Sequence, residues 1–497
     1  MASIPQYPGV HVVELPSSVR PIAGTSTSVT GFIGRAPRGP TDRAVLVRSV
    51  ADFDRHFGGI WFDSLLGYMV HHYFRNGGRQ AIVARTAPGA TPATATVPAS
   101  GTPANLLLAA ANPGPWGDNL QAQVEVTDGR FTLVIEEIDP SKATTDPARI
   151  VAREAHPNLG VATDDARRVD RVLGQHSRLA RATALPENVP LATGAAIGFG
   201  GATGDSAPVL ADYRTALRHL AEAGTVNLLC LAPPTRTGDV SSDVWGEAVT
   251  WATDRRAMVL VDPPASWSTV ALAAARTGLT SITSPNATFY YPRVNIADPL
   301  RAQRPLAIGP GAAAAGVMAR TDGTRGVWKA PAGFDAGVSG ISTPALALRD
   351  SDSEVLNPAG INAIREIPGA GPVLWGARTA DGADVRASQW KYLPVRRLAL
   401  FIEESLVQGL QWVVFEPNDE PLWSQIRLNV GAFMNNLFRQ GAFQGATARE
   451  AYFVKCDSET TQPGDVNLGV VNVLVGFAPL KPAEFVVLQF QQLLQAS

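Results

Sequence analysis

The chain has 497 residues, of which 45% are hydrophobic and 17% charged, and its formal net charge is −2. This length exceeds that of one ordinary domain, so we expect several domains with large buried surfaces. The near-neutral charge gives no electrostatic argument for nucleic acid or an anionic membrane as a partner.

Cysteine content and the N-terminal residues bear on the compartment of the protein. Cys230 and Cys456 are too few and too far apart for a disulfide framework or a metal cluster, and Cys230 in VNLLCLAPP is expected to be a buried free thiol. The start, MASIPQYPGV, lacks the basic and apolar regions of a signal peptide. No uninterrupted apolar run reaches the roughly 18 residues that a membrane span needs. We therefore expect cytoplasmic synthesis without a signal peptide and no insertion into a membrane.

Residues 1–20 are predicted to form an extended N-terminal arm. Prolines punctuate this stretch, and proline favours extended backbone and edge positions. Between them lies YPGVHVVEL, in which Val10, Val12 and Leu15 form a β-prone run. Frayed termini are usually polar, so this apolar start predicts a segment that pairs with another chain.

Residues 21–88 have the pattern strand, helix, helix, strand. The run SVTGFIG is typical of a strand, and Asp52 is expected to begin a short helix that ends at Gly58. Asp63 is expected to cap a helix over SLLGYMVHHYFRN. His71 and His72 are adjacent and so point to different sides of that helix, which predicts a structural role and not a metal pair.

Residues 89–190 are predicted to be an inserted, surface-facing, β-rich domain. APGATPATATVPASGTP is rich in proline, alanine and threonine, which indicates a linker or exposed turns. NLQAQVEVTDGRFTLVIEE then predicts a hairpin, with Asp128 and Gly129 at its turn. The remainder, as far as LPENVPLATG, is polar and broken.

Residues 191–384 alternate apolar runs with helical patterns. Asp212 is expected to cap YRTALRHLAEAG, and the strand VNLLCLAPP follows. A helix near 244–255, the strand AMVLVDPP, a helix over 266–277 and the strand TFYYPRV come next. Such a βαβ succession predicts a parallel sheet covered by helices.

Residues 385–497 are predicted to be an assembly domain of two amphipathic helices and several strands. In the first helix, Leu398, Phe401, Ile402, Ser405 and Gly409 share one side. In the second, an apolar stripe recurs at helical spacing and comprises Trp423, Ile426, Val430, Phe433, Met434 and Leu437. The last strand contains Phe485, Val487, Leu488 and Phe490, and an open edge this apolar would favour pairing with another chain.

The sequence was also tested for catalytic and cofactor motifs. A subtilisin-type protease needs Asp, His and Ser in that chain order, but every histidine lies at or before His219, which falls within a predicted helix. Ser339 and Ser342 are the nearest stand-ins for a nucleophile. GPGAAAAG at 309–316 misses the dinucleotide fingerprint spacing, and GGATGD at 200–205 lacks the lysine of a P-loop. We therefore expect no catalytic residue, no metal and no cofactor.

Four segments resemble contractile tail sheath proteins, the family that forms the outer cylinder of phage tails and phage-derived injection systems. They are YPGVHVVE with GTSTSVTGFIGRAPRGP, PGAAAAGVMARTDGTRGVWKAPAG, NPAGINAIREIPGAGPVLWGART and VRRLALFIEESLVQGLQWVVFEPND. The resemblance is weakest over 87–190. It implies a multidomain α/β and α+β fold: a subtilisin-like α/β domain without a triad, a C-terminal α+β sheath domain, a β-rich insertion and extended terminal arms.

The resemblance also implies a function and partners. The chain would be a structural protomer that polymerises with copies of itself around an inner tube protein. It would contract to drive that tube through a target envelope, with baseplate and terminal cap proteins as further partners. Such a particle would be made in the bacterial cytoplasm, as a phage tail or a tail-like device kept inside the cell or released by lysis. A degenerate α/β hydrolase and a non-contractile self-assembling shell protein remain the alternatives.

The resemblance further assigns expected roles to two groups of residues. Val10, Val12, Leu15, Phe485, Val487, Leu488 and Phe490 would pair between subunits. The C-terminal domain would face the tube, and the polar side of its second helix would contact it through Ser424, Arg427, Asn435 and Arg439, with the surface around Arg396 and Glu403 as the second choice. Polar contacts are individually weak and sensitive to salt, which suits a tube that must be released.

Overall fold

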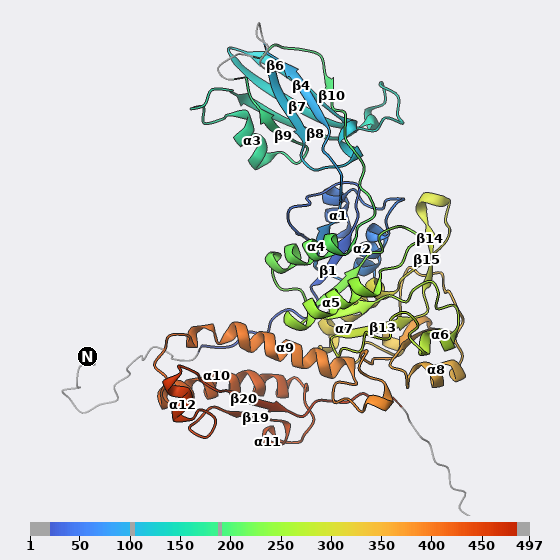
Figure 1. Cartoon of the computed structure of the whole chain (residues 1–497), viewed down its shortest axis with the longest axis vertical. Coiled ribbons are helices and arrows are strands. Elements are labelled where there is room, and N and C mark those ends of the chain that lie inside the picture. The colour runs from blue at the N-terminus through green and yellow to red at the C-terminus, as the bar shows by residue number, and fades with distance from the viewer. Residues whose placement is uncertain (1–19, 100–104, 187–190, 485–497) are drawn as a thin grey trace, which may run out of the picture. The chain divides into compact units, whose positions relative to one another are not determined.

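The computed structural model describes residues 20–99, 105–186 and 191–484 (Figure 1). The chain forms two compact units, one of residues 26–397 and one that joins the stretch up to Thr25 to residues 398–497. The expected boundaries at 20/21 and 384/385 therefore differ from those of the compact units. The paired residues Val10, Val12, Leu15, Phe485, Val487, Leu488 and Phe490 lie outside the described residues.

An eight-stranded sheet forms the centre of the larger unit, in the order β18-β17-β13-β12-β11-β1-β3-β2. Its six inner strands run parallel, and the edge strands β2 and β18 are antiparallel to their neighbours. The parallel sheet predicted from the sequence is thus confirmed. The bounds are β1 Thr30–Gly34, β2 Val45–Val47, β3 Ala81–Arg85, β11 Leu228–Leu231, β12 Met258–Val261, β13 Ala287–Tyr291, β17 Asn362–Ile367 and β18 Gly371–Trp375.

Helices cover both faces of this sheet because neighbouring strand residues point to opposite sides. On one face, Phe32 of β1 meets Tyr73 of α2 with ring centroids 5.5 Å apart, and α7 packs beside α2. On the other, Ile33 joins a core that includes Trp245 and residues of α4 and α5. The helices of this unit are α1 Val50–Phe57, α2 Leu66–Arg75, α4 Leu210–Ala223, α5 Ser242–Asp254, α6 Val270–Ala274, α7 Gly311–Arg325 and α8 Asp350–Leu356. A small sheet of β14 Val294–Asp298, β15 Arg304–Ile308 and β16 Thr343–Pro344 adjoins them.

Three helix starts differ from the expected ones. α1 begins at Val50, with Ser49 as its cap, because the Ser49 hydroxyl accepts a bond from the Asp52 backbone N–H. Asp63 does not cap α2, which starts at Leu66 without a side-chain cap. Asp212 lies inside the first turn of α4, where its carboxylate accepts from the Val209 N–H at 2.8 Å. Asp52 and Asp212 lie in the first turn of their helices and not at the cap, whereas Asp63 precedes the start of α2.

The insertion is more ordered than its composition indicates. The predicted hairpin is confirmed, with Asp128 (φ 51°) and Gly129 (φ 77°) in left-handed conformations at the turn. The expectation of a linker over APGATPATATVPASGTP is wrong over Thr94–Pro98, which is a strand with Ala95 and Val97 buried. The segment of alternating threonine and small apolar residues fits a half-buried strand.

The described residues of this insertion form two antiparallel sheets and one α-helix, and it extends beyond the expected end at residue 190. The elements are β4 Thr94–Pro98, β5 Asn105–Ala110, β6 Leu120–Thr127, β7 Arg130–Ile138, β8 Ile150–Leu159, α3 Val169–His176, β9 Ala180–Ala184 and β10 Ile197–Gly198. The stretch read as polar and broken thus contains β8, α3 and β9, whose apolar residues join one core under both sheets.

The smaller unit contains the two predicted amphipathic helices. Its elements are α9 Leu393–Gly409, whose first turns belong to the larger unit, α10 Glu420–Arg439, α11 Ala448–Ala451, β19 Tyr452–Lys455, α12 Pro463–Asn467 and β20 Leu474–Phe477. The Asp419 carboxylate caps α10 by accepting from the Leu422 N–H at 3.1 Å, and Pro421 occupies the first turn. All six residues of the predicted apolar stripe are buried. The rings of Phe401 and Phe433 lie 6.1 Å apart, so α9 packs on α10, and α10 in turn packs on β19.

Candidate functional site

The carboxyl ends of parallel strands are where an α/β sheet usually binds ligands, at the point where the strand order reverses. In this sheet the strand order reverses at β1, which has β11 on one side and β3 on the other. The space is filled by the protein's own ion pairs. Arg35, just after β1, makes two bonds of 2.8 Å to the carboxylate of Asp205, and Asp298 accepts from Tyr68 at 2.7 Å and pairs with Arg236.

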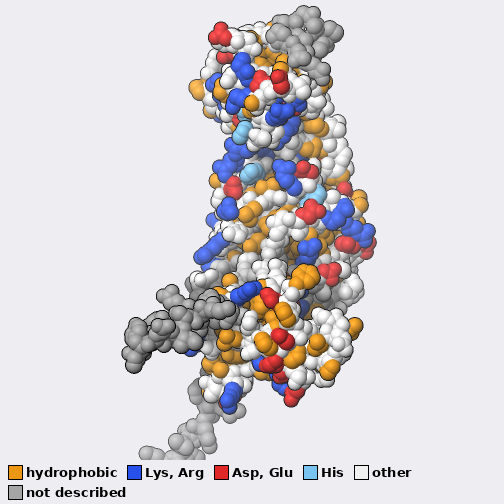
Figure 2. Space-filling view, turned by 90° about the vertical axis from the view of Figure 1, so that its left-hand side faces the viewer, with side chains coloured by type: hydrophobic (Ala, Val, Ile, Leu, Met, Phe, Trp, Pro, Cys, Tyr) orange, Lys and Arg blue, Asp and Glu red, His pale blue; other side chains and the backbone are white. Residues whose placement is uncertain are grey.

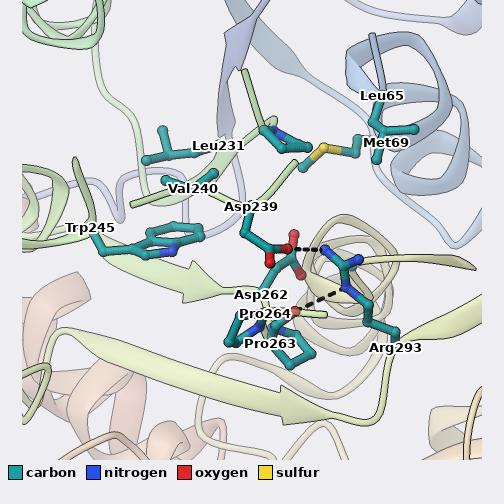
Figure 3. A pocket seen from close by; sticks show the side chains of 12 residues that line it. Leu65, Met69, Leu231, Asp239, Val240, Trp245, Asp262, Pro263, Pro264 and Arg293 are labelled. Atoms are coloured by element: carbon teal, nitrogen blue, oxygen red, sulfur yellow. Dashed lines mark hydrogen bonds and ion pairs between the residues drawn. The ribbon is translucent and has the colours of Figure 1, made fainter. Parts of the chain in front are cut away.

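A small cavity is lined by Leu231 at the end of β11, by Asp262 after β12, and by Asp239 and Arg293 among others (Figure 3). Asp262 follows β12 and accepts from the Gly311 N–H at 2.7 Å, and Arg293 pairs with Asp239 at 2.6 Å. Burial raises the pKa of Asp262 to about 6. The cavity measures about 20 Å³, which is enough for one water, whereas ligand pockets enclose roughly 300–1,000 Å³. This edge of the sheet has the chemistry of a packed polar core.

The structure does not bring together the three candidates for a hydrolase base and nucleophile, His219, Ser339 and Ser342. His219 lies on α4, which covers one face of the sheet. The Ser339 N–H donates to Asn76, just after α2 on the opposite face, at 2.7 Å. Ser342 is exposed, and its N–H donates to the backbone of Asn295.

The two histidines of α2 have different surroundings, since His71 has a carboxylate partner and the buried His72 Nδ1 has none among the described residues. His71 bonds the Asp54 carboxylate at 2.8 Å, and burial lowers the pKa of His72 to about 4. Within the described ranges, no group of three or more His, Cys, Asp or Glu residues could hold a metal ion. Cys230 and Cys456 are both buried free thiols. No helix in the described part of the chain is long and apolar enough to cross a bilayer.

The motif NPAGINAIREIPGAGPVLWGART builds a buried polar hub. Asn362 is fully buried, and its amide donates to Thr288, to the Phe289 carbonyl and to the Arg378 carbonyl while accepting from the Arg378 N–H. The Arg378 guanidinium bonds Asp384 at 2.9 Å. Arg276 reaches the Ala380 carbonyl at 2.8 Å, and burial lowers its pKa to about 10. The bonds of Asn362, Arg378 and Arg276 hold loop carbonyls and a carboxylate in place, so these three side chains have a structural role.

A second buried network joins α7 to the start of α9. Arg397 makes bidentate contacts of 2.9 and 2.5 Å to the carboxylate of Asp322, and both side chains are at most 5% exposed. Thr27 completes the network, because its hydroxyl donates to Asp322 and its carbonyl accepts from Arg397. Charge-assisted bidentate pairs of this kind are geometrically specific.

In the smaller unit, residues 20–25 lie along α9 and α10. Ile22 packs so closely on Gly409 that a Cβ there would lie 2.6 Å from it, and a Cβ at Gly24 would lie 2.9 Å from the Phe401 ring. The Thr25 N–H donates to the buried Ser405 hydroxyl at 3.1 Å. The side of the first helix predicted from the sequence therefore receives the base of the N-terminal arm.

The sheet of this unit has two strands among the described residues, β19 and β20, paired antiparallel over four residues. Phe453 and Leu474 are about half exposed, at 49% and 52%. A two-stranded sheet is marginal alone, and its outer edges leave backbone groups free to pair.

The four expected tube-contact residues on α10 are not equivalent. Ser424 and Arg439 are exposed and Asn435 is half-buried. Arg427 is held within the unit, bonding Glu420 at 2.6 Å and also the Cys456 carbonyl. On the same side of α10, Leu428 is 55% exposed, a residue the sequence analysis passed over. The second-choice residue Arg396 donates to Asn286 at 3.0 Å within the larger unit.

An apolar loop between α9 and α10 was also missed. Phe415 is fully exposed with a φ of 72°, a conformation that non-glycine residues seldom adopt, and Val414 beside it is 63% exposed. Asn418 ties this loop to the Val470 carbonyl at 3.0 Å, near the exposed Leu468. The apolar residues of VVFEPND were the feature of the sequence from which this loop could have been predicted. In Figure 2, by contrast, acidic and basic side chains are interspersed over the face shown.

Comparisons with known proteins identify the family of this chain. Two family models match, the phage tail sheath protein central domain over 210–380 and the phage tail sheath C-terminal domain over 386–492. The tail sheath protein of Vibrio phage KVP40 is 32% identical over 180 residues, which cover 35% of this chain and 25% of that protein. That of Burkholderia phage BcepMu is 34% identical over 139 residues, covering 27% and 29%. The matched segments thus span about a quarter of the length of these relatives.

Solved structures match over nearly the whole chain. The anti-feeding prophage helical sheath in its contracted state is 22% identical with a TM-score of 0.59, covering 98% of this chain and 100% of that one. The sheath of the extracellular contractile injection system PVC, also contracted, is 20% identical with a TM-score of 0.60 and covers 99% of both chains. These likenesses establish the fold, and together with the two matched domains they show that the chain belongs to the phage tail sheath protein family.

Proposed function

We propose that this chain is the structural protomer of a contractile sheath. Copies of it polymerise around an inner tube, and the polymer shortens to drive the tube through a target envelope. The sheath domains and the match to contracted sheaths support this proposal. Its partners are further copies, the inner tube protein, a baseplate and a terminal cap, in a phage tail or tail-like particle. The protomer is not an enzyme and consumes no nucleotide.

One observation carries the proposal most directly: among the described residues, the sheet of the smaller unit has two strands. β19 and β20 pair only with each other among the described residues, while the chain enters the unit at Arg20 and leaves the described residues at Glu484. Beyond both points the sequence is apolar. Strands from neighbouring protomers would supply the missing backbone partners.

The arm residues of this proposal are Val10, Val12 and Leu15 at the start, and Phe485, Val487, Leu488 and Phe490 at the end. Each segment alternates enough apolar residues to cover a sheet face when paired. Links of this kind keep subunits connected while their other contacts exchange, as a change between two packings requires. Deleting residues 1–16 tests the arm, because the protomer should fold yet form no sheath.

The tube contact is proposed on the outer side of α10. Ser424 and Arg439 are exposed there, Asn435 is half-buried, and Leu428 adds an apolar centre. Arg427 contributes less to this tube contact than the sequence analysis expected, because its guanidinium is bonded to Glu420 and to the Cys456 carbonyl.

The two alternatives make different predictions. A degenerate α/β hydrolase is disfavoured because His219, Ser339 and Ser342 are not brought together, although a subtilisin-like ancestry of the larger unit would fit its parallel sheet. A non-contractile shell would use the same arms but exist in one form. Electron microscopy of purified particles separates the possibilities: cylinders of two lengths, a single fixed form, or monomers.

A further inference from the structure

The tip of the hairpin formed by β14 and β15 is basic and exposed. It comprises residues 299–304, where Leu300 is 48% exposed and lies beside the exposed side chains of Arg301 and Arg304. With two arginines and no acidic residue, the tip has a formal charge of +2. Neither guanidinium bonds another residue in the described part of the chain. The tip therefore presents two unpaired cations around an apolar side chain.

This tip is held from its base by the chain itself. The buried Asp298 carboxylate accepts from the Tyr68 hydroxyl at 2.7 Å and from the Leu300 N–H at 3.0 Å. The Asp298 carbonyl accepts from the Gln303 N–H at 2.9 Å, which closes the loop. Ala302 (φ 51°) and Gln303 (φ 61°) are both left-handed, a conformation that persists in such residues where the surrounding structure holds it. A loop fixed in this way loses little entropy when it binds a partner.

The outer side of α8 has the opposite charge. Residues 349–355 contain three acidic residues and one arginine, a formal charge of −2. Asp350 and Glu354 are four residues apart, so they share one side of the helix. The Asp350 side chain is 90% exposed although it pairs with Arg365, and Val355 beside Glu354 is 49% exposed. This side of α8 thus matches the hairpin tip, with an exposed apolar residue beside two like charges of the other sign.

We propose that the hairpin tip of one protomer docks on the outer side of α8 of a second copy. This inference rests on the proposed function, because it identifies one of the contacts between protomers. The hairpin and α8 lie well apart within the larger unit (Figure 1), so the contact joins two copies through two different surfaces. A heterologous contact of this kind repeats from copy to copy and builds an open helical assembly. The opposite charges orient the two surfaces, and Leu300 and Val355 supply apolar contact between them.

Charge reversal on both sides tests this contact. Arg301→Glu and Glu354→Arg each place like charges opposite one another, so each should raise the concentration above which the full-length protomer sediments as polymer by at least about ten-fold. The two changes together restore opposite charges and should return this threshold to within about two-fold of the wild-type value. Both side chains are exposed, so the Tm of the unassembled protomer should stay unchanged. The matched control is Arg153→Glu on β8, whose side chain is 60% exposed and which should leave the threshold unchanged.

Each contrary result has a defined meaning. If either single variant polymerises at the wild-type threshold, or if the combined variant shows no recovery, the hairpin does not dock on α8 and the inference is overturned. If Arg153→Glu raises the threshold as much as Arg301→Glu does, net charge and not this contact controls assembly, which also overturns it. A wild-type chain that forms no polymer at any concentration would instead refute the proposed function.

Discussion

Removing the Asp322 carboxylate tests how firmly α7 is tied to the start of α9. In Asp322→Ala, the guanidinium of Arg397 would remain 4% exposed but lose both of its carboxylate contacts, and the Thr27 hydroxyl would lose its acceptor. A buried charge without a partner cannot recover its hydration unless the surrounding structure opens.

The expected loss of stability is large. Breaking one side of a buried ion pair costs about 3–5 kcal/mol. At about 2 °C per kcal/mol for a large domain, the Tm should fall by roughly 6–10 °C. The same change at a surface pair costs under about 1 kcal/mol.

A thermal melt of the unassembled protomer measures this effect, with Asp350→Ala as the control. Asp350 pairs with Arg365 at 2.6 Å, but its side chain is 90% exposed. Equal Tm shifts for the two variants would refute the reasoning. As a second check, the double variant Asp322→Leu with Arg397→Met should recover much of the lost stability, since apolar residues can replace a buried pair at little cost.

Three further predictions concern pH, the tube and catalysis. Burial lowers the pKa of His72 to about 4 from 6.5, so between these pH values the unfolded chain binds more protons than the folded one. The free energy of unfolding should therefore fall by up to about 3 kcal/mol as the pH drops from 7 to 4. An equally steep fall of stability with pH in His72→Phe would contradict this. Arg439→Glu should leave the Tm unchanged but reduce the yield of tube-filled extended particles in micrographs; wild-type yield would exclude this side of α10 as the tube contact. Alanine variants of His219, Ser339 and Ser342 should still assemble and contract, because none of these residues is expected to be catalytic. Stoichiometric labelling of a serine in the wild type by a fluorophosphonate probe would contradict the absence of catalysis.

Local patterns in the sequence predicted much of the architecture. The apolar stripe of α10, the turn at Asp128 and Gly129 and the alternation of strands with helices each depend on neighbours a few residues apart. The strand Thr94–Pro98 was missed because alanine and threonine resemble low-complexity sequence until a partner strand buries one side of them.

The candidate sites were less accessible from the sequence, because they depend on contacts between distant residues. Arg427 appeared free on its helix, but the Cys456 carbonyl that holds it comes from another element. The bond from the Arg20 N–H to Asn429 Oδ1 likewise joins residues that lie far apart in the sequence. The apolar tip at Phe415 could have been noticed in the sequence, whereas its positive φ could not.

The most direct test of the central claim is cryo-electron microscopy of particles purified from cells that express this chain with its neighbouring particle proteins. We expect cylinders in two states, a long narrow form that contains a tube and a short wide form, both built from this chain. We also expect the sheet of β19 and β20 to be extended by strands from neighbouring protomers. Cylinders of one fixed length under all triggering conditions, or a β19–β20 sheet that no neighbouring strand joins, would contradict the account.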